Sequence, residues 1–213
     1  MRPVPFDLGV YLVTDRGSLA GRDLLDVVGR AVAGGARLVQ LREKNACTRE
    51  FVELARALVA LVRPLGAKLV INDRVDVALA CDADGVHVGQ DDMRPADVRA
   101  LIGPKRILGL SVTGEVEARA ARGEPVDYLG AGPVFATTTK LDAGAPQGLT
   151  GLARMLALAE VPVVAIGAVT AANAASVMAT GTAGVAVVSA ICSAADPLAA
   201  AKALRAIVDA ARV

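Results

Sequence analysis

The sequence predicts a single α/β domain, a (βα)8 barrel that spans residues 1–213, and three regularities lead to this prediction. Short continuous runs of Val, Ile and Leu recur along the chain. Amphipathic helical segments separate these runs, and glycines often stand where a helix ends. Continuous apolar strands are typical of parallel sheets that are covered on both faces. Repeated units of strand, loop, helix and glycine at this chain length fit a barrel.

The apolar runs are the expected strands. They cover residues 9–13, 38–41, 69–71, 85–88, 107–110, 126–130, 163–166 and 184–188. An open, doubly wound sheet is the structural alternative. The dinucleotide-binding version of that fold is weakened because no Gly-x-Gly-x-x-Gly follows the first run. We see no linker and no second domain.

The clearest helical segments are residues 23–33, 48–62, 115–122 and 197–211. Asp196 and Pro197 suit the N-cap and first position of the last helix. Glycines follow several helical segments just before the next strand, as helix C-termini favour, at Gly34, Gly66, Gly123 and Gly181.

With 23 basic and 22 acidic residues, the chain has a net charge of +1. It has no overall field to attract nucleic acid or an acidic membrane, so we expect small-molecule partners.

Residues 161–195 carry no charge, and hydropathy alone would suggest a membrane span there. Prolines and glycines interrupt that stretch, which therefore reads better as strand, helix and strand.

Three cysteines, Cys47, Cys81 and Cys192, form an odd set without CxxC spacing. This argues against a disulfide framework or a zinc site, and we interpret them as reduced thiols in or near the core.

The N-terminus has no apolar segment typical of a signal peptide, so we expect a cytoplasmic protein. The sequence leaves open whether the chain forms a homo-oligomer.

Residues that directly follow the strands of a barrel face one shared pocket. After the second strand, Gln40, Arg42 and Lys44 are spaced by two. In an extended chain this spacing places an amide, a guanidinium and an ammonium on one side, with Leu41 and Glu43 turned away. A solvated charged loop is the alternative.

The next two strands end on acids. Asn72 and Asp73 follow the third strand, and Asp91 and Asp92 follow the fourth. If these strands are neighbours, Asp73 and one of the later acids come within reach of a single hard cation. Asp91 or Asp92 could instead be an N-cap of the following helix. His87, the only histidine, lies within an apolar strand and is better explained as a satisfied core residue than as a base.

The later strand ends are suited to phosphate. Ser111 follows the fifth strand, and a loop pinned by glycine and proline after the sixth carries Thr137, Thr138, Thr139 and Lys140. The last two strands lead into small or uncharged residues that include Ala168, Val188 and Ser189. Backbone N–H groups there can hold a phosphate, although close packing alone would also explain them. A metal edge opposite an uncharged phosphate cradle implies two phosphorylated substrates.

Seven short motifs follow one another in the order of the strand ends. They are Tyr11-Leu12-Val13-Thr14-Asp15, Gln40-Leu41-Arg42-Glu43-Lys44, Ile71-Asn72-Asp73, His87-Val88-Gly89-Gln90-Asp91-Asp92, Gly109-Leu110-Ser111, Gly132-Pro133-Val134-Phe135 with Thr137-Thr138-Thr139-Lys140, and Val188-Ser189. In these motifs the sequence resembles the thiamine-phosphate synthase family over nearly its whole length.

The resemblance implies an enzyme that joins a hydroxymethylpyrimidine diphosphate to a hydroxyethylthiazole phosphate, with Mg²⁺ as cofactor. By position, Asp73 and Asp92 look like the Mg²⁺ ligands. The pyrimidine diphosphate site then comprises Gln40, Arg42, Lys44, Asn72, Ser111 and Lys140, with Leu41 and Glu43 in the same motif, and Arg42, Lys44, Ser111 and Lys140 are the expected catalytic residues. The thiazole side comprises Thr137, Thr138 and Thr139, with Ala168, Val188 and Ser189 at the phosphate.

Two departures from the family bear on this interpretation. Ala168 stands where the family usually has a second glycine, and alanine disfavours a positive φ, so the phosphate loop is expected to be shifted or weakened. Thiazole tautomerases share the barrel but use a histidine shortly after the fifth strand, where this chain has Val112 and Thr113.

A metal-independent isomerase and a non-catalytic binder of thiamine precursors are the remaining alternatives. The sequence gives no sign of a Ser/His or Cys/His partnership.

Overall fold

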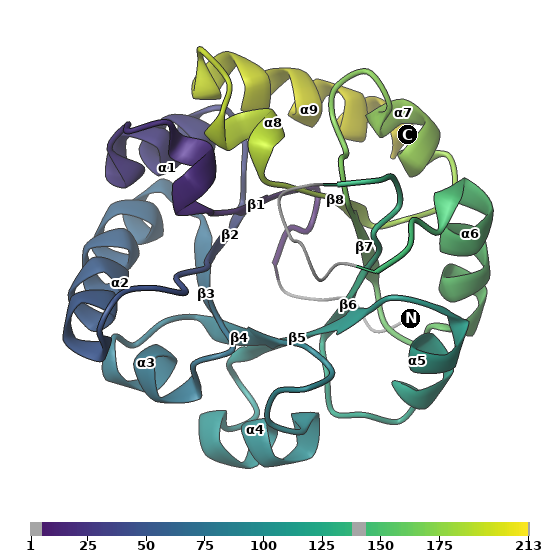
Figure 1. The fold of residues 1–213 in the computed structure, drawn as a ribbon, viewed down its shortest axis with the longest axis horizontal. Helices are drawn as coiled ribbons and strands as arrows, with labels where there is room; N and C mark the ends of the chain where they lie inside the picture. Colours follow the sequence, from purple (N-terminus) through teal and green to yellow (C-terminus); the bar gives the residue numbers. More distant parts are fainter. Residues whose placement is uncertain (1–5, 138–143, 213) are drawn as a thin grey trace.

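The computed structural model describes residues 6–137 and 144–212, and these form a closed parallel barrel surrounded by helices (Figure 1). The strands neighbour one another in chain order, and β1 closes the barrel by pairing with both β2 and β8. Their bounds are β1 (Val10–Val13), β2 (Leu38–Leu41), β3 (Lys68–Asn72), β4 (Gly85–Val88), β5 (Ile107–Val112), β6 (Tyr128–Ala131), β7 (Val163–Ile166) and β8 (Gly184–Val187). The predicted (βα)8 barrel is confirmed, and the open-sheet alternative is excluded.

Helical segments follow the strands and form the outer layer (Figure 1). They are η1 (Arg16–Leu19), α1 (Leu24–Ala33), α2 (Thr48–Val62), η2 (Arg63–Leu65), α3 (Val75–Ala80), α4 (Pro95–Ile102), α5 (Glu115–Ala120), α6 (Gly148–Leu158), α7 (Ala174–Met178), α8 (Ser189–Cys192) and α9 (Pro197–Ala211). The uncharged stretch forms β7, α7 and β8, as expected. Nowhere in residues 6–137 and 144–212 is there a helix long and apolar enough to cross a membrane.

Side-chain capping sets the starts of α1 and α9, and the cap of α9 is the one that the sequence predicts. The carboxylate of Asp23 accepts a hydrogen bond from the N–H of Asp26. Asp196 accepts from the N–H groups of Leu198 and Ala199, directly before Pro197. Each cap satisfies donors that the first helical turn leaves without an intrahelical partner.

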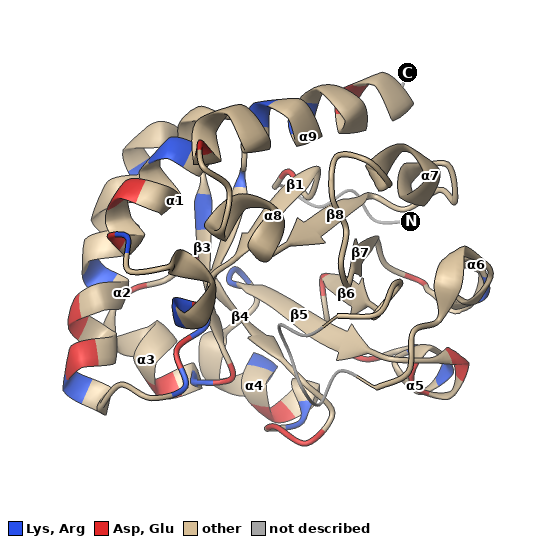
Figure 2. Cartoon of the chain, turned by 45° about the horizontal axis from the view of Figure 1, so that its top comes forward, with Lys and Arg blue, Asp and Glu red and all other residues tan. Residues whose placement is uncertain are grey.

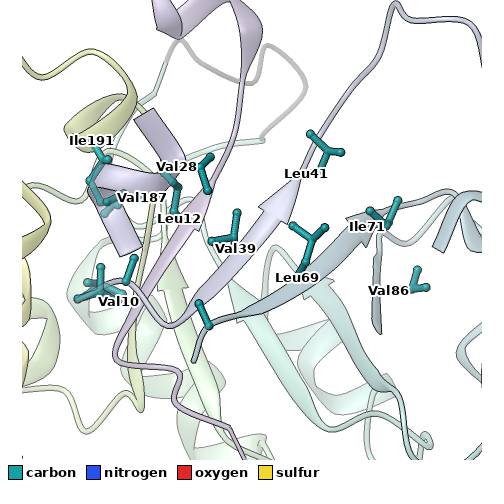
Figure 3. Close-up of a cluster of buried hydrophobic side chains, with 14 of the residues drawn as sticks. Val10, Leu12, Val28, Val39, Leu41, Leu69, Ile71, Val86, Val187 and Ile191 are labelled. Carbon is teal, nitrogen blue, oxygen red and sulfur yellow. The ribbon is translucent and has the colours of Figure 1, made fainter. Parts of the chain in front are cut away.

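Alternating residues of the strands build two separate cores. Side chains such as Leu12, Val39, Leu69 and Ile71 point outward and pack under the helices (Figure 3). The inward-facing set fills the barrel itself and includes Tyr11, Leu38, Val70, Ile107, Tyr128 and Val164. The continuous apolar character of the strands follows from this burial on both faces.

The surface carries both signs of charge. Lys and Arg lie interspersed with Asp and Glu along α1, α2 and α4, whereas the strands are nearly free of charge (Figure 2). All three cysteines are free thiols. Cys81 and Cys192 are buried, but Cys47 is exposed at the N-cap of α2, so the core interpretation was wrong for that residue.

Candidate active site

A pocket of about 360 Å³ opens at the carboxyl ends of the strands, and residues from all of β1 to β8 or the loops after them line it. In a parallel barrel this is the end where side chains from different loops converge. The described members of the predicted site that line it are Gln40, Arg42, Lys44, Asn72, Asp73, Asp92, Ser111, Thr137, Ala168, Val188 and Ser189. Thr138, Thr139 and Lys140 lie outside the described residues.

The alternation predicted after β2 is present. Gln40, Arg42 and Lys44 line the pocket, whereas Leu41 is buried in the outer core. Glu43 also faces away from the pocket. Its side chain is only 3 % exposed and forms an ion pair with Arg16. Both residues belong to the predicted substrate-binding motif, but the structure gives them supporting positions behind the pocket wall.

Residues of the first strand end hold Arg42 in place. Asp15 accepts a hydrogen bond from Nη1 of Arg42 at 3.2 Å, and the hydroxyl of Thr14 accepts one from the Arg42 backbone N–H at 3.1 Å. Asp15 also accepts from the N–H of Ser18 at the start of η1. The sequence places Asp15 on the rim, directly after an apolar strand, but its spacing alone does not reveal the contact with Arg42.

Asp73 and Asp92 meet at the ends of β3 and β4. Lys44 donates to Asp73 at 2.8 Å, and the N–H of Gly89 donates to Asp92 at 2.7 Å. Burial raises the pKa of Asp92, and its hydrogen bond and charge contact with Asp73 raise it further. Burial opposes ionisation of Asp73 too, but hydrogen bonds from Lys44 and Asp92 outweigh it, so the pKa of Asp73 lies below its usual value.

Such a pair suits a divalent cation. Two adjacent carboxylates repel each other unless they share a proton or a cation. Residues 6–137 and 144–212 contain no cluster of three or more His, Cys, Asp or Glu that could enclose a metal. Mg²⁺ commonly takes only one or two carboxylates and fills its remaining positions with water and substrate phosphates. The capping alternative is wrong, because α4 begins after Arg94 with no side-chain cap.

His87 is a buried, hydrogen-bonded core residue, as expected. It is 7 % exposed, and its Nδ1 and Nε2 lie 2.8 Å and 2.9 Å from the hydroxyls of Tyr128 and Ser111. The pairing of His87 with Ser111 corrects the sequence analysis, which predicts no Ser/His contact. The two residues lie on the adjacent strands β4 and β5. Their side chains meet only because of the register between these two strands in the closed barrel.

The loops after β7 and β8, where the sequence predicts phosphate binding, line another part of the pocket. Gly167 has a φ of +109°, and a Cβ there would lie 2.5 Å from the Cα of Pro133, so only glycine fits. Ala168 adopts a positive φ of 49°, a conformation that alanine disfavours. Asn173 fixes this conformation by donating to the carbonyl of Ala168 at 3.0 Å and accepting from the N–H of Thr170 at 2.8 Å. The loop therefore keeps a left-handed turn despite the alanine.

We expect Ala168→Gly to increase the free energy of unfolding by about 1 kcal/mol, because an L-residue in the left-handed region costs roughly 1–2 kcal/mol and glycine does not. Urea denaturation of both proteins measures this difference. Ala190→Gly, on the neighbouring short helix α8, is the matched control and should destabilise the protein instead. A loss of stability in Ala168→Gly would show that the turn is not strained.

The fold and the pocket define a (βα)8-barrel protein with a charged small-molecule site. Residues 10–191 match the family model described as thiamine monophosphate synthase. The chain is 86% identical over 207 residues to a thiamine-phosphate synthase of Solidesulfovibrio magneticus, covering 97% of this chain and 98% of that one. A second thiamine-phosphate synthase, from Xanthobacter autotrophicus, is 58% identical over 210 residues, or 99% and 100% of the two chains.

A solved structure, thiamine phosphate pyrophosphorylase from Pyrococcus furiosus, superposes with a TM-score of 0.87 at 42% identity and covers 96% of each chain. The chain belongs to the thiamine-phosphate synthase family, and it is an enzyme of thiamine biosynthesis. A more distant structure, 3-hexulose-6-phosphate synthase, has a TM-score of 0.66 at 20% identity over 94% of this chain and 99% of that one, and shows the shared fold alone.

Proposed function

We propose that the enzyme condenses 4-amino-2-methyl-5-(diphosphooxymethyl)pyrimidine with 4-methyl-5-(2-phosphooxyethyl)thiazole to give thiamine phosphate and diphosphate, in a reaction that depends on Mg²⁺. The observation that carries this proposal is the acid pair of Asp73 and Asp92 beside the cations Arg42 and Lys44, all on one pocket wall. A diphosphate with its divalent cation fits this wall. The uncharged loops at Ala168 and Ser189 suit a monophosphate on the other side.

Different residues of the site would contribute to carbon–oxygen bond cleavage in different ways. Diphosphate leaves only if its growing negative charge is neutralised, and Arg42 and Lys44 supply fixed positive charge for this purpose. Asp73 and Asp92 would hold Mg²⁺, which when bound supplies Lewis-acid stabilisation of the leaving diphosphate. Lys140 is expected to add a further positive charge. The electron-rich aminopyrimidine can carry the resulting cation, which supports a dissociative step followed by attack of the thiazole nitrogen.

This route requires no nucleophile from the protein. Although Ser111 and His87 are hydrogen-bonded, the second nitrogen of His87 contacts the phenol of Tyr128. A nucleophilic serine needs a histidine whose developing positive charge is balanced by a carboxylate, and a neutral phenol does not provide that balance. We therefore assign Ser111 to substrate binding and stabilisation, and we expect the reaction to take place in the cytoplasm.

A two-substrate assay tests the proposal. Product should form when both phosphorylated substrates are mixed with the enzyme and Mg²⁺, should stop when EDTA is added in excess, and should resume when Mg²⁺ is restored. Either substrate alone is the control and should give no product. Equal rates with and without EDTA would remove the metal from the mechanism, and conversion of the thiazole alone would favour an isomerase.

A further inference from the structure

A continuous chain of hydrogen bonds crosses the inside of the barrel at the floor of the pocket, where Tyr11 and His87 also belong to the lining. Nε2 of Gln40 donates to the hydroxyl of Tyr11 at 2.5 Å, and the Tyr11 and Tyr128 hydroxyls are 2.8 Å apart. The Tyr128 hydroxyl lies 2.8 Å from Nδ1 of His87, whose Nε2 lies 2.9 Å from Oγ of Ser111. The chain therefore links β2 to β5 and has a pocket-lining residue at each end.

The barrel is built to hold the middle of this chain. Tyr11 and Tyr128 are 1% and 0% exposed, and the ring of Tyr128 also packs against His87 at a centroid distance of 5.4 Å. A Cβ at Gly109 would lie 2.2 Å from Cζ of Tyr128 and 2.4 Å from Nδ1 of His87. Only glycine leaves room for the two rings at this point on β5.

The hydrogen bonds of this series all run in one direction. Burial raises the pKa of both phenols, so each remains protonated and donates one hydrogen bond. Gln40 donates to the Tyr11 hydroxyl, and among the described residues the Tyr128 hydroxyl is the other group within hydrogen-bond distance of it. The Tyr11 proton therefore goes to Tyr128, and the Tyr128 proton goes to Nδ1 of His87. His87 then carries its proton on Nε2 and donates to Ser111. Within residues 6–137 and 144–212, the Oε1 acceptor of Gln40 and the O–H donor of Ser111 have no other hydrogen-bond partner, so these two ends are open to a ligand.

We propose that Tyr11, Tyr128 and His87 are positioning residues that fix this direction, so that Gln40 accepts from and Ser111 donates to the pyrimidine ring and thereby select an aminopyrimidine. The inference rests on the proposed function, in which Gln40 and Ser111 bind the pyrimidine. An amino group beside a ring nitrogen offers one donor and one acceptor. A 4-oxo ring with a protonated ring nitrogen offers the reverse and mismatches both ends.

The first test is the protonation pattern of His87. It is the only histidine in the chain, so its ring nitrogens give unambiguous signals in a ¹⁵N-labelled sample of the whole protein. We expect the tautomer with the proton on Nε2, both without ligand and with the pyrimidine diphosphate. A proton on Nδ1 would reverse the direction of the chain and overturn the proposal.

The second test compares binding of the pyrimidine diphosphate and its 4-oxo analogue by calorimetry, with Mg²⁺ present and no thiazole. The wild-type protein should prefer the amino compound by about 100-fold, because both end contacts mismatch the analogue. Tyr128→Phe breaks the chain and frees Ser111 and Gln40 to reorient, so the preference should fall by roughly tenfold or more. Tyr11→Phe should act in the same way and replaces Tyr128→Phe if that variant does not fold.

The matched control is Thr182→Val, which removes a buried hydroxyl away from the pocket. Thr182 is 5% exposed and donates to the carbonyl of Val163 at 2.6 Å. The control should lower stability but leave the amino-to-oxo preference unchanged. If both tyrosine variants keep the wild-type preference while the wild-type enzyme forms product, the positioning chain is refuted and the proposed function stands. If the wild-type enzyme forms no product, the proposed function itself fails.

Discussion

Asp73→Asn should lower the turnover number by about three orders of magnitude without unfolding the barrel, because it removes one of two predicted metal ligands and the partner of Lys44. Asparagine is the informative substitution. Asp73 has a φ of 61°, and asparagine tolerates this left-handed conformation far better than most residues. Steady-state kinetics with saturating substrates and a range of Mg²⁺ concentrations would measure the loss.

Asp82→Asn is the matched control for this variant. Asp82 has a φ of 54°, so the same chemical change is made on the same kind of backbone. Asp82 lies in the loop that enters β4, at the other end of the barrel from the pocket. Its carboxylate forms ion pairs there with Arg106 and Arg63. We expect normal turnover from the control. Near-normal turnover in Asp73→Asn would remove that residue from the catalytic site.

Arg42→Gln should lower the turnover number by roughly 10²- to 10³-fold, because glutamine keeps a hydrogen-bond donor but removes the charge that we propose stabilises the leaving diphosphate. Arg42 is well placed for this role, since Asp15 and Thr14 hold it and its side chain is only 20% exposed. If the charge acts mainly as the bond breaks, the turnover number should fall more than the affinity for the pyrimidine diphosphate. Binding measured by calorimetry separates the two effects.

Arg16→Gln provides the comparison on the same rim. Arg16 also carries a guanidinium next to an acid, but its side chain is 62% exposed, pairs with Glu43 and lies outside the pocket lining. Its loss should change activity by less than about twofold, since an exposed ion pair contributes little. Equal losses in both arginine variants would mean that general surface charge, and not a placed guanidinium, assists the reaction.

The strand ends could be predicted from the sequence because the burial of each strand is visible in its own residues. A buried strand reads as a continuous apolar run, and the first polar residues after it mark the pocket end of the barrel. The predicted run at residues 85–88 became β4 without change, and Gln40, Arg42 and Lys44 line the pocket as their spacing required. Differences such as the extension of β5 to Val112 are confined to element ends.

Contacts across the barrel could not be predicted, because they depend on the register between strands. The bond between His87 and Ser111, and the support of Arg42 by Asp15, join residues more than twenty positions apart. The positive φ of Ala168 could not be predicted for a different reason, because a contact within its own loop overrides the intrinsic preference of alanine. Intrinsic preference disfavours its positive φ, but two hydrogen bonds of the Asn173 side chain stabilise the turn.

Asp7 joins the beginning of the barrel to its last helix. Its carboxylate forms ion pairs with Arg205 and, at 3.0 Å, with Arg212, on the side of the barrel where β1 begins. The pocket opens on the other side, where the strands finish. A tether, a fluorescent fusion or a solid support attached near residue 7 or residue 212 would therefore leave the route of substrates into the enzyme unobstructed, and a short peptide joining these neighbouring positions would suit a circular permutant.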